Sequence, residues 1–65
     1  MNYLQIIEAF TIFSKYSLRH QEIAAEHGEL FAGPESEIVS VEDRQRLEEL
    51  GWYPDKFETG FRATV

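Results

Sequence analysis

The sequence predicts a small α+β domain spanning residues 1–65, with the element order helix, strand, helix, strand, strand. Three observations support this prediction. Apolar residues recur at helical spacing near the N-terminus, a capping box opens an acidic helix in the second half, and apolar and polar residues alternate at the C-terminal end. The simplest arrangement of these elements is a three-stranded, mainly antiparallel sheet with both helices packed on one face.

Residues 2–17 are predicted to form an amphipathic helix that begins with a capping box of Asn2 and Gln5. One face carries apolar side chains at three- and four-residue spacing: Tyr3, Ile6, Ile7, Phe10 and Phe13. Four more widen this face beyond the stripe of about 100° that is usual for a surface helix: Leu4, Ala9, Ile12 and Tyr16. Either a second layer of the fold or a partner chain would cover the extra surface. In the second case, the protein would self-associate through this helix.

A strand is predicted from Ala25 to Ala32, because residues 30–32 suit a strand, although residues 22–27 have good helix propensity. Gly28 would then mark a bulge or a close approach of another backbone. The alternative is a tight hairpin that turns at His27 and Gly28, which a glycine at that position permits.

The second helix is predicted to begin at Ser40, in the capping box Ser40–Asp43, with acids at the positive end of the helix dipole. Val41, Leu47 and Leu50 form its expected buried stripe. Gly51 suits a left-handed C-terminal cap, after which Trp52 would pack back onto Leu47.

The last residues predict a hairpin, with residues 52–56 as one arm, 58–60 near the turn and 61–65 as the other arm. Pro54 lacks an amide donor, so its arm is expected at the edge of the sheet. Trp52 and Phe61 are expected to face the core. Tyr53 and Phe57 are expected nearer the exposed side, where aromatic residues often bind protein partners.

The amino-acid composition indicates a folded protein and excludes chemistry that depends on cysteine. The 43% hydrophobic content and nine aromatic residues predict a folded chain, and the lack of cysteine excludes disulfides, thiolate catalysis and cysteine zinc sites. No apolar run approaches the roughly 18 residues that cross a bilayer, and the N-terminus has no features of a secretion signal. We therefore expect a cytoplasmic protein that does not bind membranes.

Negative charge is concentrated in the middle of the chain. Residues 22–50 hold nine acids and two arginines, a sum of −7 in a chain of net charge −6. Such a segment repels phosphate backbones and attracts basic proteins, so a protein partner is expected and direct nucleic-acid binding is not. The residues predicted to bind the partner are Glu42, Asp43, Glu48, Glu49, Tyr53 and Phe57.

Signals for chemistry are sparse. Imidazole and carboxylate groups that could bind zinc or manganese gather around His20, Glu26 and His27, but the two histidines are seven residues apart and do not form an H-E-x-x-H motif. A glycine-rich phosphate loop and a G-x-S-x-G motif are both absent from the sequence. We expect no enzymatic activity and no cofactor, and a metal site around His20 and His27 is kept as an alternative.

Three segments carry a resemblance to known proteins: Ala-Glu-His-Gly-Glu-Leu-Phe at residues 25–31, Ser-Val-Glu-Asp at 40–43 and Leu-Glu-Glu-Leu-Gly-Trp at 47–52. They resemble a group of small uncharacterised proteins carried by bacteriophages and prophages, which typically show Ala-Glu-His-Asp before an apolar strand and an acidic helix ending in Leu-Gly-Trp. The resemblance covers roughly residues 23–60, and Gly28 stands where the group has aspartate. It implies a phage or mobile-element origin and no particular activity.

The leading functional prediction is a non-enzymatic, acidic protein-interaction module, an accessory phage or mobile-element protein that binds a basic host or phage protein. The first alternative is a self-associating structural protein, and the second is the metal site at His20 and His27.

Overall fold

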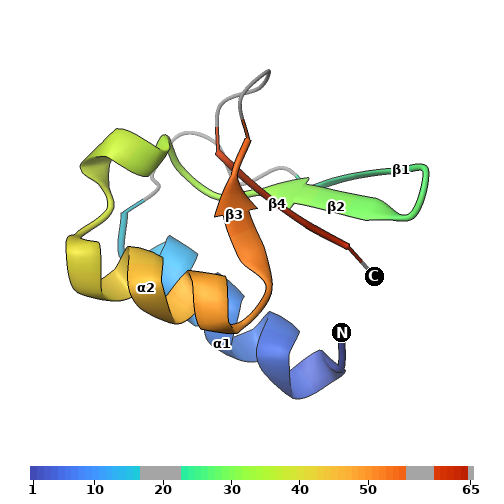
Figure 1. The fold of residues 1–65 in the computed structure, drawn as a ribbon, viewed down its shortest axis with the longest axis horizontal. Coiled ribbons are helices and arrows are strands. Elements are labelled where there is room, and N and C mark those ends of the chain that lie inside the picture. Colours follow the sequence, from blue (N-terminus) through green and yellow to red (C-terminus); the bar gives the residue numbers. More distant parts are fainter. Residues whose placement is uncertain (17–22, 56–59, 65) are drawn as a thin grey trace.

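The structure is a computed structural model that describes residues 1–16, 23–55 and 60–64. Its elements follow the order α1 (Tyr3–Ser14), β1 (Ala24–Glu26), β2 (Glu29–Ala32), the 3₁₀ helix η1 (Ser36–Ile38), α2 (Val41–Glu49), β3 (Trp52–Pro54) and β4 (Phe61–Thr64). Figure 1 shows both α-helices on the same side of the strands, as predicted.

The sheet has four strands in the order β1-β2-β4-β3, and every neighbouring pair is antiparallel. The predicted three-stranded sheet with a single strand from Ala25 to Ala32 is therefore wrong, and so is the order helix, strand, helix, strand, strand. That segment folds into the β1–β2 hairpin, as the alternative prediction had it. His27 and Gly28 form the turn with φ of 51° and 79°, and two successive positive φ angles match the twist of the flanking strands.

The β3–β4 pair confirms the predicted C-terminal hairpin. Trp52 lies opposite Ala63, Tyr53 opposite Arg62 and Pro54 opposite Phe61, with β3 at the edge of the sheet as Pro54 predicts. Because side chains alternate along a strand, Trp52, Phe61 and Ala63 point together toward the helices, where all three are buried. Phe57 and the predicted turn at residues 58 and 59 lie outside the described residues.

Helix α1 has the predicted capping box, in which the side chains of Asn2 and Gln5 each accept a hydrogen bond at 2.9 Å from the other's backbone amide. Its buried residues are Ala9, Ile12 and Phe13. The predicted core positions Tyr3 and Ile7 are instead 73% and 56% exposed. The fold covers the side of α1 that carries Ala9, Ile12 and Phe13 and leaves the opposite side in solvent along the length of the helix. The helix ends at Ser14, before the predicted residue 17.

Phe13 occupies the centre of the core. Its ring meets the Trp52 indole edge to face, with centroids 5.3 Å apart, and contacts Phe61 at 5.5 Å. Phe10 adds a ring 5.7 Å from Trp52. One helix and two strands therefore meet in a cluster of four aromatic side chains, which supplies much of the apolar area that so small a chain buries.

Helix α2 has the predicted N-cap, with Ser40 Oγ accepting a hydrogen bond at 3.2 Å from the amide of Asp43. The predicted capping box is only half formed, because the amide of Ser40 donates to the hydroxyl of Tyr16 instead of to the side chain of Asp43. Leu47 and Leu50 are buried, but Val41 is 58% exposed, so its predicted place in the buried stripe is wrong. Val39, just before the cap, is buried instead. Gly51 closes the helix with φ of 95° and donates to the carbonyl of Glu48 at 3.0 Å, as the predicted left-handed cap requires.

Candidate interaction surfaces

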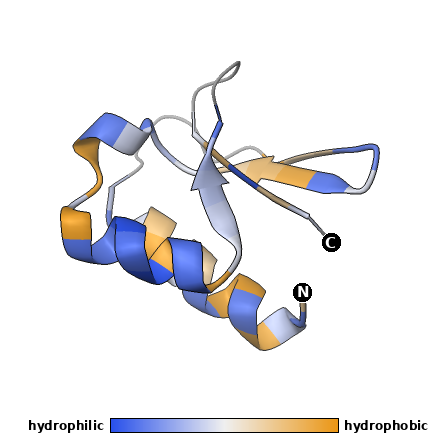
Figure 2. Cartoon of the chain, viewed as in Figure 1, coloured by the Kyte–Doolittle hydropathy of each residue, from blue (hydrophilic) through white to orange (hydrophobic). Residues whose placement is uncertain are grey.

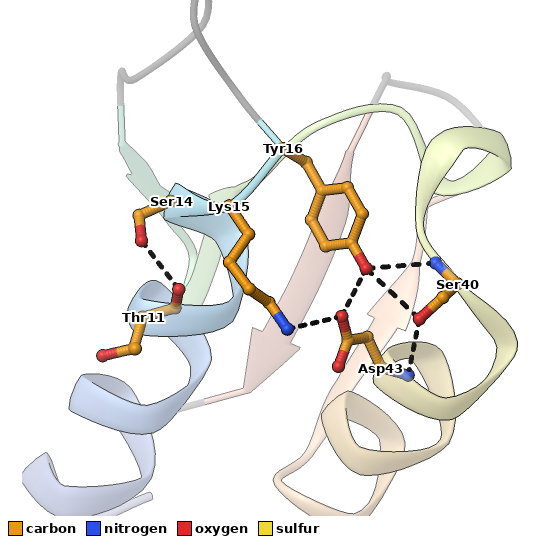
Figure 3. A network of polar contacts seen from close by, with 6 residues as sticks. All are labelled: Thr11, Ser14, Lys15, Tyr16, Ser40 and Asp43. Atoms are coloured by element: carbon orange, nitrogen blue, oxygen red, sulfur yellow. Dashed lines mark hydrogen bonds and ion pairs between the residues drawn. The ribbon is translucent and has the colours of Figure 1, made fainter.

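A polar cluster joins the end of α1 to the start of α2 (Figure 3). The hydroxyl of Tyr16 donates a hydrogen bond to Oδ2 of Asp43, and Nζ of Lys15 lies 2.9 Å from the same oxygen. The backbone amide of Ser40 donates to the Tyr16 hydroxyl at 3.3 Å. We call Lys15, Tyr16, Ser40 and Asp43 the Tyr16–Asp43 cluster.

The cluster keeps Asp43 ionised. Hydrogen bonds from Lys15 and then from Tyr16 hold the pKa of Asp43 below its ordinary value of 3.8, although partial burial opposes this effect. The same contact with Asp43 raises the pKa of Lys15. The Asp43 side chain is only 19% exposed. Asp43 was predicted to bind a partner. In the structure its carboxylate contacts Tyr16 and Lys15 instead and so joins the two helices.

A second polar contact joins the helices through Arg46. Its Nη2 donates to Oε1 of Glu8 at 2.8 Å, and its Nη1 lies 3.2 Å from Oε1 of Glu49. The hydrogen bond between Arg46 and Glu8 raises the pKa of Arg46 above its ordinary value and lowers the pKa of Glu8 below its ordinary value. Glu8 lies in α1 before Lys15, the residue that caps the C-terminal end of this helix, whereas Arg46 follows Asp43 in α2. The two contacts therefore show that the helices run antiparallel, side by side.

The outward side of α2 carries the remaining acids. Positions three and four residues apart share a helix face, so Gln45 lies among its neighbours Val41, Glu42, Glu48 and Glu49, all exposed. Ile38, in η1 just before the helix, is 54% exposed. Figure 2 shows α2 as mostly hydrophilic, with hydrophobic residues at its start and in the preceding segment. We call this surface the acidic face: Val41, Glu42, Gln45, Glu48 and Glu49.

Two acids of this face stand outside the ion pairs of the described residues. Across residues 1–16, 23–55 and 60–64, the ion pairs join Lys15 to Asp43, Arg46 to both Glu8 and Glu49, and Arg62 to Glu29. Glu42 and Glu48 take part in none of these pairs. Their exposed carboxylates, with Gln45 between them along the helix, are therefore available to a cation from another molecule.

Tyr53 lies on the other side of the molecule. It points away from the helices on the outer face of the sheet, 49% exposed, opposite Arg62. Arg62 is also opposite Phe31, and its guanidinium lies 3.6 Å from Glu29. The structure therefore separates Tyr53 from the acids with which it was predicted to act. Phe57, the other predicted aromatic contact, lies outside the described residues.

His27 sits in the β1–β2 turn between Glu26 and Glu29, whose α-carbons are partners in the hairpin. His20, the other histidine of the metal alternative, falls outside the described residues. Within the described part of the chain, no three histidine, aspartate or glutamate side chains gather in a way that would hold a metal ion.

Sequence reasoning missed Ile38 as a surface residue. A signal was present, because Ile38 and Val39 are adjacent apolar residues before a helix cap, and the residue directly before the cap is the one that usually packs against the helix. Val39 is buried accordingly, at 3% exposure, which leaves Ile38 outside.

Comparison of the chain with protein-family models, with curated proteins and with solved structures gives no match. The resemblance to phage-borne proteins therefore stays a prediction. Neither helix in the described ranges has the length and apolar character that crossing a membrane requires.

Proposed function

We propose that the protein is a non-enzymatic protein-interaction module whose acidic face binds a basic surface of a partner protein. The observation that carries this proposal is the division of acids on α2. Asp43 is engaged within the fold, whereas Glu42 and Glu48 point outward without an ion pair among the described residues. Carboxylates that the fold does not use are available to a cationic partner.

Exposed apolar groups strengthen the proposal. Ile38 and Val41 are each more than half exposed, and Val41 directly precedes Glu42 in the first turn of α2. Protein interfaces combine a small apolar centre with a polar rim, and the apolar centre supplies affinity that charge alone does not. The acidic face has both parts on one side of α2. Its carboxylates would select for lysine and arginine and would repel the phosphates of nucleic acid.

The proposal extends to the origin of the chain. The resemblance of residues 25–31, 40–43 and 47–52 to small phage- and prophage-borne proteins supports an accessory protein of a phage or mobile element, and the partner would then be a basic host or phage protein.

The test compares proteins captured from a bacterial lysate by the wild type and by the double variant Glu42→Lys/Glu48→Lys. Glu42 and Glu48 are both exposed on α2, and substitutions at exposed positions change stability little, so the variant should fold. We expect the wild type to retain basic proteins at about 50 mM salt and to release them at about 500 mM, because salt screens exposed charges. The variant should retain none of them.

The matched control is Glu26→Lys/Glu35→Lys, which makes the same change of charge at two exposed sites away from α2, one in β1 and one directly before η1. It should capture the same proteins as the wild type. Capture that is insensitive to salt, or that is lost equally in the control, would contradict the proposal.

A further inference from the structure

The exposed side of α1 carries a short apolar seam. Leu4 and Ile7 are 64% and 56% exposed, and Thr11 and Ser14 continue the same side with spacings of three, four and three residues. This is the spacing with which one helix packs along another in a coiled coil. We call Leu4, Ile7, Thr11 and Ser14 the α1 seam. It lies opposite Ala9, which is completely buried.

The seam is prepared for burial, since it has no charge and few unsatisfied polar groups. The hydroxyl of Thr11 donates to the carbonyl of Ile7 at 2.8 Å, and that of Ser14 donates to the carbonyl of Thr11 at 2.7 Å. Covering these hydroxyls would therefore leave no donor without a partner. The charged residues beside the seam are compensated within the chain, Glu8 by Arg46 and Lys15 by Asp43.

The distribution of side-chain size along the seam selects the occupant. Its N-terminal half carries the large Leu4 and Ile7, and its C-terminal half carries the small Thr11 and Ser14. When a second α1 is laid antiparallel about an axis level with Ala9, Leu4 meets Ser14 and Ile7 meets Thr11 of the other copy. Each layer then joins one large and one small side chain, whereas a parallel pair would crowd the leucines and leave the serines apart.

We infer that the α1 seam binds a second copy of this chain in an antiparallel, two-fold symmetric dimer. A two-fold interface uses the same patch on both copies, and the reversal of large and small residues makes this patch complementary to itself. The seam carries no charged residue, and the charged residues beside it are already in ion pairs. Two copies of this acidic chain can therefore meet along their seams without bringing unpaired acids together. The contact is independent of the acidic face on α2.

The first experiment is analytical ultracentrifugation of the full chain. The apparent mass should rise from 7.6 kDa toward twice that value between about 10 µM and 1 mM, as expected of a small interface. Each buried leucine changes affinity by about tenfold, and the symmetric dimer contains Leu4 twice, so Leu4→Ala should weaken association roughly 100-fold. Ile7→Glu should abolish it.

The control is Val41→Glu, which places the same charge at a β-branched residue of almost equal exposure on α2. This variant should still dimerise. A wild type that is monomeric at about 1 mM, or a loss of association in Val41→Glu equal to that in Ile7→Glu, would overturn the inference.

The second experiment tests the antiparallel register by cysteine cross-linking, which the lack of native cysteine makes clean. Neither Leu4→Cys nor Ser14→Cys alone should form a disulfide dimer. In the antiparallel register, each cysteine lies about 15 Å along the axis from its own copy, and a disulfide needs α-carbons within about 7 Å. An oxidised mixture of the two variants should give the mixed dimer. Cross-linking of either variant alone, or none in the mixture of a protein that sediments as a dimer, would refute this register.

Discussion

The phenol of Tyr16, at the end of α1, donates a hydrogen bond to the carboxylate of Asp43 in the first turn of α2 (Figure 3). This bond joins residues that are 27 positions apart, and Arg46 and Glu8 join the same helices further along. The central acids therefore have two roles. Asp43 holds the helices together, and Glu42 and Glu48, which no ion pair of the described residues engages, are the acids that we propose meet a partner.

Replacing Tyr16 by phenylalanine should lower the melting temperature by a few degrees. The ring is kept, but the carboxylate of Asp43 loses one donor and the amide of Ser40 loses an acceptor. Thermal unfolding followed by circular dichroism measures the change. Tyr53→Phe is the control, because the Tyr53 ring is exposed on the outer face of the sheet and its loss of a hydroxyl should leave the melting temperature unchanged. Equal melting temperatures for wild type and Tyr16→Phe would show that the bond adds nothing to stability.

Stability should fall in acid through Asp43 and Glu8. Both have pKa values in the folded protein below their ordinary values of 3.8 and 4.5, because each accepts hydrogen bonds from a cationic partner. A lowered folded pKa adds stability that is fully present above the ordinary value and is lost as the pH falls through the folded value. Urea unfolding at pH 7, 4.5 and 3 should show this decline.

The variants Asp43→Asn and Glu8→Gln separate this effect from general acid denaturation. Each should be less stable than the wild type at pH 7, and the difference should shrink toward pH 3, since the wild-type carboxyl then becomes neutral as well. A constant difference across this range would mean that the ion pairs are not its source.

Much of the fold follows from local signals in the sequence. Asn2, Ser40 and Gly51 mark helix ends through bonds to neighbouring residues, and Pro54 marks an edge strand because it lacks a donor. These signals need no knowledge of distant residues. The prediction of two helices on one face and of a C-terminal hairpin was accordingly confirmed.

The errors arise where distant contacts decide. Ala24, Ala25 and Glu26 have low strand propensity, and they form β1 only because β2 offers a pairing partner. Ile7 and Ile12 are equally apolar, yet only Ile12 is buried. Which side of α1 is buried depends on where the sheet and α2 pack against it. The role of Asp43 depends in the same way on Tyr16, which no local pattern connects to it.

Truncating the aromatic core should unfold the protein. Phe13→Ala or Trp52→Ala should each cost about 3–5 kcal/mol, because both rings are buried in one cluster and the chain cannot fill the space. A domain of this size has roughly 3–10 kcal/mol of stability in total. Thermal melts should show little folded protein for either variant, whereas Tyr53→Ala, at an exposed aromatic, should melt near the wild type. Cooperative, near-native melts for both core variants would mean that the core lies elsewhere.

Gly60→Ala should destabilise the protein more than Gly28→Ala. Both glycines have positive φ, so alanine is strained by about 1–2 kcal/mol at either site. At Gly60 the new methyl would also lie 2.8 Å from the carbonyl oxygen of Gly33, a backbone atom that cannot rotate away, whereas at Gly28 it would meet nothing within 4 Å. Chemical denaturation of the two variants measures the difference. Equal losses would show that β4 does not approach the end of β2 this closely.

The acidic face is tested most directly by NMR, with the ¹⁵N-labelled chain titrated with a basic protein that it captures. We expect the amide shifts to concentrate at Val41, Glu42, Gln45, Glu48 and Glu49, and added salt to reverse them. Shifts concentrated instead at Phe31, Tyr53 and Arg62, on the outer face of the sheet, would contradict this expectation.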